Sequence, residues 1–133
     1  MKKIFEEIEA MYEGTKGLEG YITALQGAYV AKKPIIGIGA GRMGYSLRAH
    51  IMRLSRIGYD TWFIGDTTLP RIDKTSVVVI NSSSGETPTN ILYAQQARAA
   101  GSYIITITCN KTSTIAMLSD LVVETPTLES HQL

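Results

Sequence analysis

The sequence predicts an α/β fold in which five parallel strands form a doubly wound sheet with helices on both faces. Three observations lead to this prediction. Short apolar runs rich in β-branched residues alternate along the chain with longer segments of helical periodicity. Glycines follow one of these runs directly and serines follow another after a single asparagine, as at the strand-to-helix turns of such sheets. A chain of 133 residues, 44% of them hydrophobic, can bury one ordinary core.

The N-terminal segment, residues 1–33, is predicted to be helical. Apolar residues recur at helical spacing in two stretches, residues 4–12 and 18–29. Three glycines at positions 14, 17 and 20 weaken the join between them, so the segment is one broken helix or two. The apolar stripe is expected to be packing surface, and Pro34 ends the helical region.

The first strand is expected at residues 35–38, and it runs into the glycine turn GAGRMG, residues 39–44. A long helical pattern follows and closes at Gly58. The GxGxxG spacing by itself suggests a dinucleotide fingerprint, because glycines let the backbone approach a pyrophosphate. This interpretation needs an acidic residue about 20 positions later to hold a ribose. Asp66, just after the next strand at residues 61–64, is a late candidate, and NAD binding stays as an alternative.

The third strand begins with four consecutive β-branched residues at positions 77–80, typical of a strand buried on both faces. Ser82, Ser83, Ser84 and Gly85 follow it and lead into a helix. Such a turn aims free backbone N–H groups and the positive end of the helix dipole at one point, which favours an anion. We interpret it as a phosphate cradle.

An alternative interpretation of the serine-rich turn is structural. Ser84 would cap the following helix, with Glu86 and Thr87 in its first turn. The turn alone does not choose between the cap and the cradle.

The later units repeat the same plan. They comprise a strand at 103–108, a short helix at 111–118 capped by Thr112 or Ser113, and a last strand at 121–124. The main domain is expected over residues 34–126 and a tail over 127–133.

The lone Cys109 excludes an intrachain disulfide and a multi-cysteine metal site. Cys109 is interpreted either as a small buried residue or as a reactive thiol. No metal site is predicted, and no cofactor is expected.

The connection lengths predict the strand order. Residues 65–75 contain Pro70 and lack helical periodicity, so strand two is expected to lie on the far side of strand one. Right-handed crossovers then give the order 2-1-3-4-5. Strands one and three become neighbours at the switch point of the sheet. The glycine turn and the serine-rich turn should therefore share one crevice. Together they support a phosphate-bearing ligand more strongly than either turn does by itself.

Charge and hydropathy exclude several classes of partner. The chain has 13 Lys and Arg against 12 Asp and Glu, a net charge of +1, and no cluster of basic residues interleaved with aromatic ones. Nucleic acid and anionic membranes are therefore not expected as partners. The N-terminus lacks the apolar run of a signal peptide, and no stretch is long enough to span a bilayer. A cytoplasmic protein is expected.

Several motifs in this order resemble the sugar isomerase (SIS) domain family, and within it most closely the 6-phospho-3-hexuloisomerases. They are GAGRMG at 39–44, RAHIMRL at 48–54, GDTT at 65–68, SSSGET at 82–87 and STIA at 113–116. The resemblance covers about residues 35–126. It implies a flavodoxin-like, doubly wound domain that binds a phosphorylated sugar.

The resemblance also implies roles for individual residues. The hydroxyl groups of Ser82, Ser84 and Thr87 would hold the phosphate, together with backbone of Ser83 and Gly85. Gly41 and Arg42 would line the opposite wall. The family reaction moves a carbonyl between C2 and C3 of a hexulose 6-phosphate and yields fructose 6-phosphate.

This reaction needs a base that removes a proton next to the carbonyl and a group that stabilises the enediolate. Glu86 is the candidate base, with a structural role at the helix dipole as the alternative. Arg42 could polarise the carbonyl or bind phosphate, the alternative being a surface salt bridge. His50 is expected to pack and His131 to be solvated, while Arg48 and Arg53 are candidate interface residues.

The sequence departs from the family pattern in two places. Met43 stands where the family has a small hydroxyl residue, and the family's further helix with a glutamate has no counterpart before Leu133. Either a base from another subunit completes the site, or the chain binds a phosphosugar without converting it. Because one face of the sheet would be thinly covered, a homodimer or homotetramer is expected.

Overall fold

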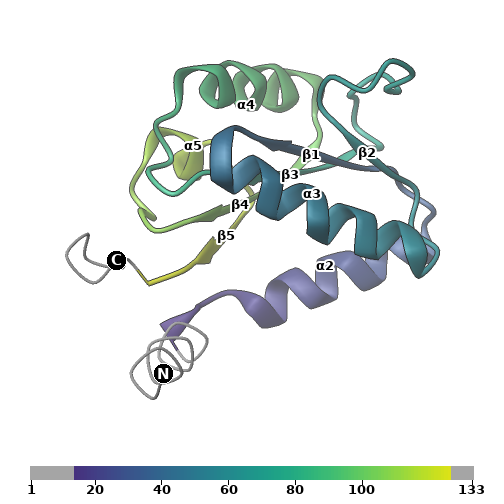
Figure 1. Cartoon of the computed structure of the whole chain (residues 1–133), viewed down its shortest axis with the longest axis horizontal. Coiled ribbons are helices and arrows are strands. Elements are labelled where there is room, and N and C mark those ends of the chain that lie inside the picture. The colour runs from purple at the N-terminus through teal and green to yellow at the C-terminus, as the bar shows by residue number, and fades with distance from the viewer. Residues whose placement is uncertain (1–13, 127–133) are drawn as a thin grey trace.

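The computed structural model describes residues 14–126, in which helices and strands alternate along the chain except between β2 and β3 (Figure 1). The elements are α2 (Leu18–Val30), β1 (Ile35–Gly39), α3 (Gly41–Arg56), β2 (Thr61–Phe63), β3 (Val77–Asn81), α4 (Pro88–Ala100), β4 (Tyr103–Thr108), α5 (Thr114–Met117) and β5 (Leu121–Glu124). The helix predicted over residues 4–12 lies outside the described residues, as does the tail at 127–133.

The five strands form one parallel sheet in the order β2-β1-β3-β4-β5, which confirms the predicted topology. Between Phe63 and Val77 the chain forms no helix, as the lack of periodicity there predicted. β1 and β3 pair in step along their whole length, so Gly39 lies opposite Asn81. The turns that follow these two strands therefore start side by side.

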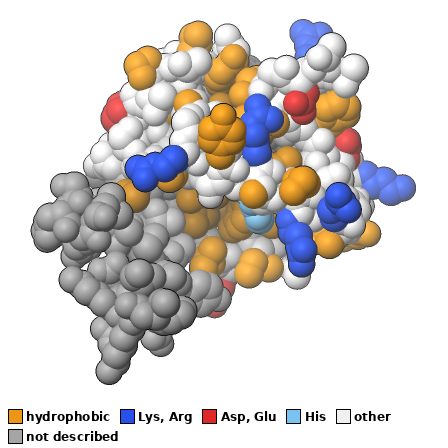
Figure 2. Space-filling model, in the orientation of Figure 1, with side chains coloured by type: hydrophobic (Ala, Val, Ile, Leu, Met, Phe, Trp, Pro, Cys, Tyr) orange, Lys and Arg blue, Asp and Glu red, His pale blue; other side chains and the backbone are white. Residues whose placement is uncertain are grey.

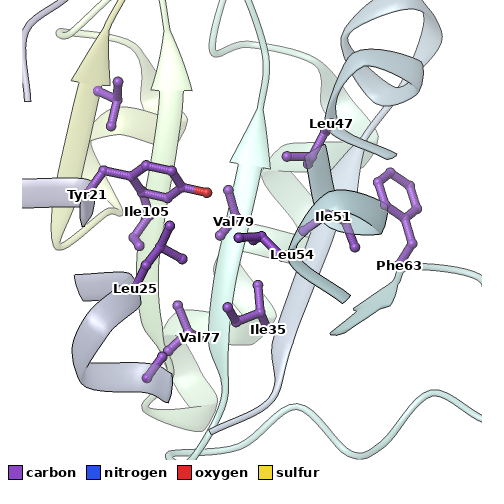
Figure 3. Packing of buried hydrophobic residues seen from close by; sticks show 12 residues of the cluster. Tyr21, Leu25, Ile35, Leu47, Ile51, Leu54, Phe63, Val77, Val79 and Ile105 are labelled. Atoms are coloured by element: carbon purple, nitrogen blue, oxygen red, sulfur yellow. The ribbon is translucent and has the colours of Figure 1, made fainter. Parts of the chain in front are cut away.

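The alternation of side chains along β3 divides the core into two layers. Val77 and Val79 pack on the face covered by α2 and α3, and Figure 3 shows this cluster. Val78 and Ile80 pack on the opposite face, under α4 and α5. Both faces of the sheet are therefore covered within the described chain, as a parallel sheet requires.

The N-terminal helix α2 belongs to this same core. Tyr21, Leu25 and Ala28 are buried against strand residues of the sheet. Just before the helix, the backbone of Lys16 pairs with Glu124 at the end of β5, with N···O distances of 2.8 and 2.9 Å. Across residues 14–126, no helix combines the length and apolar character that crossing a bilayer demands.

Two helices begin later than the sequence predicted. α4 starts at Pro88 with Thr87 as its N-cap, so Glu86 lies before the helix and not in its first turn. α5 starts at Thr114 and not at residue 111, because the Ser113 hydroxyl accepts a hydrogen bond from the Ala116 N–H and fixes the cap there. The corrected start of α4 also removes Ser84 from the capping position.

Candidate functional site

The glycine turn lets β1 and α3 approach very closely. A Cβ atom on Gly39 would lie 2.9 Å from the Gly44 Cα, and one on Gly44 would lie 2.7 Å from the Gly39 carbonyl oxygen. Two of the three motif glycines are therefore required by strand-to-helix packing. α3 begins at once with Gly41, and Arg42 in its first turn is exposed.

The serine-rich turn, residues 82–87, is held from behind by β4 and α5. The Ser82 N–H donates to the Ile107 carbonyl at 3.0 Å. The Ser83 carbonyl accepts from the Thr108 hydroxyl and the Cys109 N–H, both at 3.0 Å. These contacts, with the Ile115 N–H donating to the Gly85 carbonyl at 3.1 Å, fix the course of the turn.

The Ser82 hydroxyl organises the turn from inside. Ser82 is 2% exposed, and its hydroxyl accepts from the Gly85 N–H at 3.1 Å and lies 3.2 Å from the Thr87 hydroxyl. Gly85 has a φ of +68°, and a Cβ atom there would overlap the Ser113 side chain, its Oγ being 1.9 Å away. The Ser82 hydroxyl and the Gly85 N–H, which were predicted to bind phosphate, are thus hydrogen-bonded to each other within the turn.

Other donors of the turn are left open. Within residues 14–126 the N–H groups of Ser83, Ser84 and Thr87 have no hydrogen-bond acceptor. The exposed Ser84 hydroxyl accepts from the Glu86 N–H at 3.1 Å and keeps its own proton to donate. The first turn of α4, which starts next to them, adds further N–H groups without helical partners. This arrangement suits an anion with several oxygen atoms.

The two turns meet at one cavity of about 290 Å³. Its walls come from the glycine turn, the end of β3, the serine-rich turn and α4: Ala40, Arg42, Met43, Asn81, Ser82, Ser83, Ser84, Thr87 and Asn90. Arg42 and Ser84, which the sequence placed on opposite walls of one crevice, do line the same cavity. Gly41 lies beside it, in a separate hollow with Tyr45 and Arg48.

Comparison with known proteins assigns this architecture. The SIS domain model matches residues 32–133, more than half of the chain. The chain belongs to the SIS domain family.

Relatives of this SIS chain include proteins named 3-hexulose-6-phosphate isomerase. The one from Mycobacterium gastri is 40% identical over 88 residues, which are 66% of this chain and 44% of the relative. The one from Methanocaldococcus jannaschii is 35% identical over 80 residues, 60% of this chain and 44% of the relative. The chain spans about half the length of the curated relatives it matches.

A solved structure shares the fold as well. It is a protein from Methanococcus jannaschii for which a function as 3-hexulose-6-phosphate isomerase was inferred. It superposes with a TM-score of 0.78 at 25% identity, over 94% of this chain and 70% of that one.

In this SIS domain the predicted base, Glu86, is bound to α5. Its two carboxylate oxygens accept from the Thr114 hydroxyl at 2.6 Å and the Thr114 N–H at 2.8 Å. These two hydrogen bonds, that from the hydroxyl above all, lower the pKa of the Glu86 carboxyl. Glu86 is exposed and is not among the residues that line the cavity. Its position fits an anchor for α5 better than a base.

The dinucleotide interpretation loses its ribose-binding candidate. A carboxylate oxygen of Asp66 accepts from the Phe63 N–H at 2.7 Å, and the Asp66 N–H donates to the Phe63 carbonyl at 3.0 Å. Asp66 therefore closes the turn after β2. With Gly39 and Gly44 explained by packing, the GxGxxG spacing needs no dinucleotide.

The remaining predicted residues lie away from the cavity. His50 packs on Tyr21, its Nε2 being 2.6 Å from the tyrosine hydroxyl, and the Arg48 guanidinium stacks 3.9 Å from the centre of the Phe63 ring. Cys109 is half-buried with Sγ 3.4 Å from the Thr125 hydroxyl. His131 lies outside the described residues.

Sequence reasoning missed two residues of the cavity, Asn81 and Asn90. Each is a neutral amide at the end of a strand or in the first turn of a helix, where an asparagine ordinarily faces water. The signal for Asn81 was its position directly after a fully apolar strand, next to the serines. Nothing in the sequence distinguished Asn90.

Proposed function

We propose that this chain binds a phosphorylated ketohexose in the cavity between its glycine turn and its serine-rich turn. The phosphate would bind the open N–H groups of Ser83, Ser84 and Thr87 and the hydroxyl groups of Ser84 and Thr87. Arg42 faces the same cavity with a permanent positive charge. Ser82 and Gly85 support this site by shaping the turn.

The observation that carries the proposal is the clamped serine-rich turn. The carbonyl groups of Ser83 and Gly85 are tied to the end of β4 and to α5, while several N–H groups of the turn stay open beside one cavity that an arginine also lines. A preformed set of donors is what an anion with several oxygens needs. The names of the relatives from M. gastri and M. jannaschii support a hexulose 6-phosphate as the ligand.

The proposed reaction shifts the carbonyl of a 3-hexulose 6-phosphate from C3 to C2. A base removes the proton from C2, an enediolate forms, and a proton returns at C3, giving fructose 6-phosphate. Arg42 is the residue of the cavity that can stabilise the negative charge of the enediolate. Glu86 is the base predicted from sequence, and its role is open to a direct test by substitution.

A second candidate function is phosphosugar binding without conversion. Two observations favour it: Thr114 engages both Glu86 oxygens, and among the described residues that line the cavity none carries a carboxylate or an imidazole. In that case a base would have to come from elsewhere, for example from another subunit.

Assembly into a homodimer or homotetramer is part of the proposal. Hydrophobic side chains lie exposed among basic ones over α2 and α3 (Figure 2). They include Ile22, Tyr29 and Val30 of α2 and Met52 and Ile57 at α3, with exposed fractions from 53% to 82%. Such a patch is typical of an interface. The ligand class, a metabolic sugar phosphate, makes the cytoplasm the proposed location.

Incubation with fructose 6-phosphate, followed by NMR, tests the proposed function. Interconversion with a second hexulose phosphate supports the isomerase, and saturable binding without new sugar signals supports the binding domain. The variant Ser84→Leu should lose affinity for the phosphate group and keep its melting temperature within a few degrees. Binding that is unchanged in Ser84→Leu would overturn the site assignment.

A further inference from the structure

The lining of the cavity includes a buried amide that no neighbour among the described residues satisfies. Asn90, in the first turn of α4, is 3% exposed and lines the cavity. Within residues 14–126 its side chain makes no hydrogen bond to any other group. A polar side chain that is buried to this extent is normally paired, so the open amide of Asn90 calls for a partner.

Both polar atoms of the Asn90 amide are accessible, and Asn90 lines the cavity. In the described part of the chain, every fully buried side-chain nitrogen or oxygen has a hydrogen-bond partner. Since neither Nδ2 nor Oδ1 of Asn90 has one, both atoms must lie in the small accessible part of the residue. The donor and the acceptor are thus presented together.

A second amide lies on the neighbouring wall. Asn81, at the end of β3, donates from Nδ2 to the Met43 carbonyl oxygen at 3.1 Å. Its Oδ1 accepts no hydrogen bond within residues 14–126 and adds an acceptor to the half-buried wall. The cavity therefore has two chemically different zones. Arg42 and Ser84 are exposed and supply donors, whereas Asn90 is buried and Asn81 half-buried, and we call these two pairs the rim and the floor of the cavity.

We propose that Asn90, assisted by Asn81, is a specificity-determining residue that binds the hydroxyl or carbonyl oxygens of the ligand's carbon chain. This inference rests on the proposed function, which places the phosphate of the same ligand at the rim. A hydroxyl group both donates and accepts, and so it can pair with Oδ1 and Nδ2 of one amide at once. The site thereby recognises a polyhydroxylated phosphate ester and discriminates against phosphates that lack hydroxyl groups.

A phosphate group does not fit the amide floor equally well. A phosphate dianion has no proton to give, so it would leave Oδ1 of Asn90 and Oδ1 of Asn81 unpaired and facing negative charge. The rim offers it the N–H groups of the serine-rich turn, the Ser84 hydroxyl proton and the Arg42 guanidinium. The division of the cavity into a donor rim and a donor–acceptor floor thus orients the ligand, with its anionic end outward and its hydroxylated chain inward.

Binding measurements with three probes test this assignment. Calorimetry would compare fructose 6-phosphate, propyl phosphate and inorganic phosphate on the wild type, on Asn90→Leu and on Asn90→Ala. Gln95→Leu, which removes an exposed amide from the same helix, is the matched control. We expect both Asn90 variants to bind fructose 6-phosphate about 10- to 100-fold more weakly, because the ligand hydroxyl loses its partner. Their affinity for propyl phosphate and inorganic phosphate should change less than about twofold.

If a variant fails to fold, a measurement on the wild-type protein still tests the role of Asn90. The side-chain NH₂ signals of Asn90 in ¹⁵N-labelled protein should shift on addition of fructose 6-phosphate and shift far less with inorganic phosphate. Unshifted signals, or an equal loss for all three probes, would overturn the role of Asn90 while leaving the proposed function intact. If the wild type binds none of the three probes, the proposed function fails and this assignment fails with it.

Discussion

Asn81 at the end of β3 donates a hydrogen bond from Nδ2 to the backbone carbonyl of Met43 in the first turn of α3, at 3.1 Å. The contact joins two segments that are 38 residues apart in the sequence. It ties the glycine turn to the strand that carries the serine-rich turn. This side chain therefore helps to fix the relative position of the two walls of the cavity, in addition to the pairing of β1 with β3.

Substitution of Asn81 should loosen this junction. Asn81→Ala leaves the Met43 carbonyl without its partner, and we expect the free energy of unfolding to fall by about 1 kcal/mol. Affinity for fructose 6-phosphate should fall as well, because Arg42 and Ser84 would no longer be held at a fixed separation. Chemical denaturation and calorimetry check the two effects. Unchanged affinity in a folded Asn81→Ala protein would show that other contacts position the walls and that Asn81 does not assist Asn90 in binding the ligand.

Gly85 and Gly41 form a matched pair for testing backbone strain. Both have positive φ, +68° and +59°, but a Cβ on Gly85 would collide with Ser113 whereas one on Gly41 would meet nothing within 4 Å. Gly41→Ala should lower the free energy of unfolding by about 1–2 kcal/mol, because alanine is strained at a positive φ. Gly85→Ala should lower the free energy of unfolding by about 1–3 kcal/mol more than Gly41→Ala, because the overlap with the Ser113 side chain must also be relieved. Equal losses in urea denaturation would contradict the overlap.

Glu86 and Thr114 allow a catalytic role to be separated from a structural one. If Glu86 anchors α5, Glu86→Gln and Thr114→Val should lower turnover of a hexulose phosphate by similar, modest factors. If Glu86 is the base, the kcat of Glu86→Gln should be about 100-fold or more below that of the wild type. The kcat of Thr114→Val should then stay close to the wild-type value. We expect the first result because both carboxylate oxygens are occupied. Steady-state kinetics of the two variants decides between them.

The hydrogen bond between Tyr21 and His50 should make stability depend on pH. Burial lowers the pKa of the His50 imidazole and raises that of the Tyr21 hydroxyl, so the folded protein favours the neutral pair. The unfolded chain then binds more protons than the folded one as the pH falls below the usual histidine pKa of about 6.5. Stability contributed by His50 is present above that pH and lost below it.

The measurement for this pair is urea denaturation between pH 7.5 and pH 5. His50→Gln should flatten the decline in unfolding free energy, and His131→Gln, the matched control, should leave it as in the wild type. The range lies above the region where the lowered carboxyl pKa values of Glu86 and Asp73 act, since those carboxylates lose their stabilisation only at more acidic pH. An undiminished decline in His50→Gln would assign the effect to other groups.

The sequence predicted the order of the sheet because the relevant signals are local. Four β-branched residues in a row mark β3, and the absence of periodicity over residues 65–75 marks the connection without a helix. These two signals, combined with the handedness of crossovers, were enough to bring the glycine turn and the serine-rich turn together.

The errors concern contacts between distant segments. Glu86 looked like a first-turn residue because its partner, Thr114, lies 28 positions further along. Asn90 was not predicted as a site residue, because its burial arises only from the packing of α4 in the folded chain. The glycine spacing suggested a dinucleotide, whereas Gly39 and Gly44 allow the close approach of a strand and a helix. Short-range patterns carry none of this information.

The small helix α5 supplies no atom to the lining of the cavity, yet two of its residues hold the serine-rich turn, through the Ile115 N–H and through Thr114. Occupancy of the cavity and folding of this single turn of helix are consequently linked equilibria. A bound sugar phosphate would slow the hydrogen exchange of the Ile115 amide. Fraying of α5 would, in turn, lower the affinity of the cavity for its ligand.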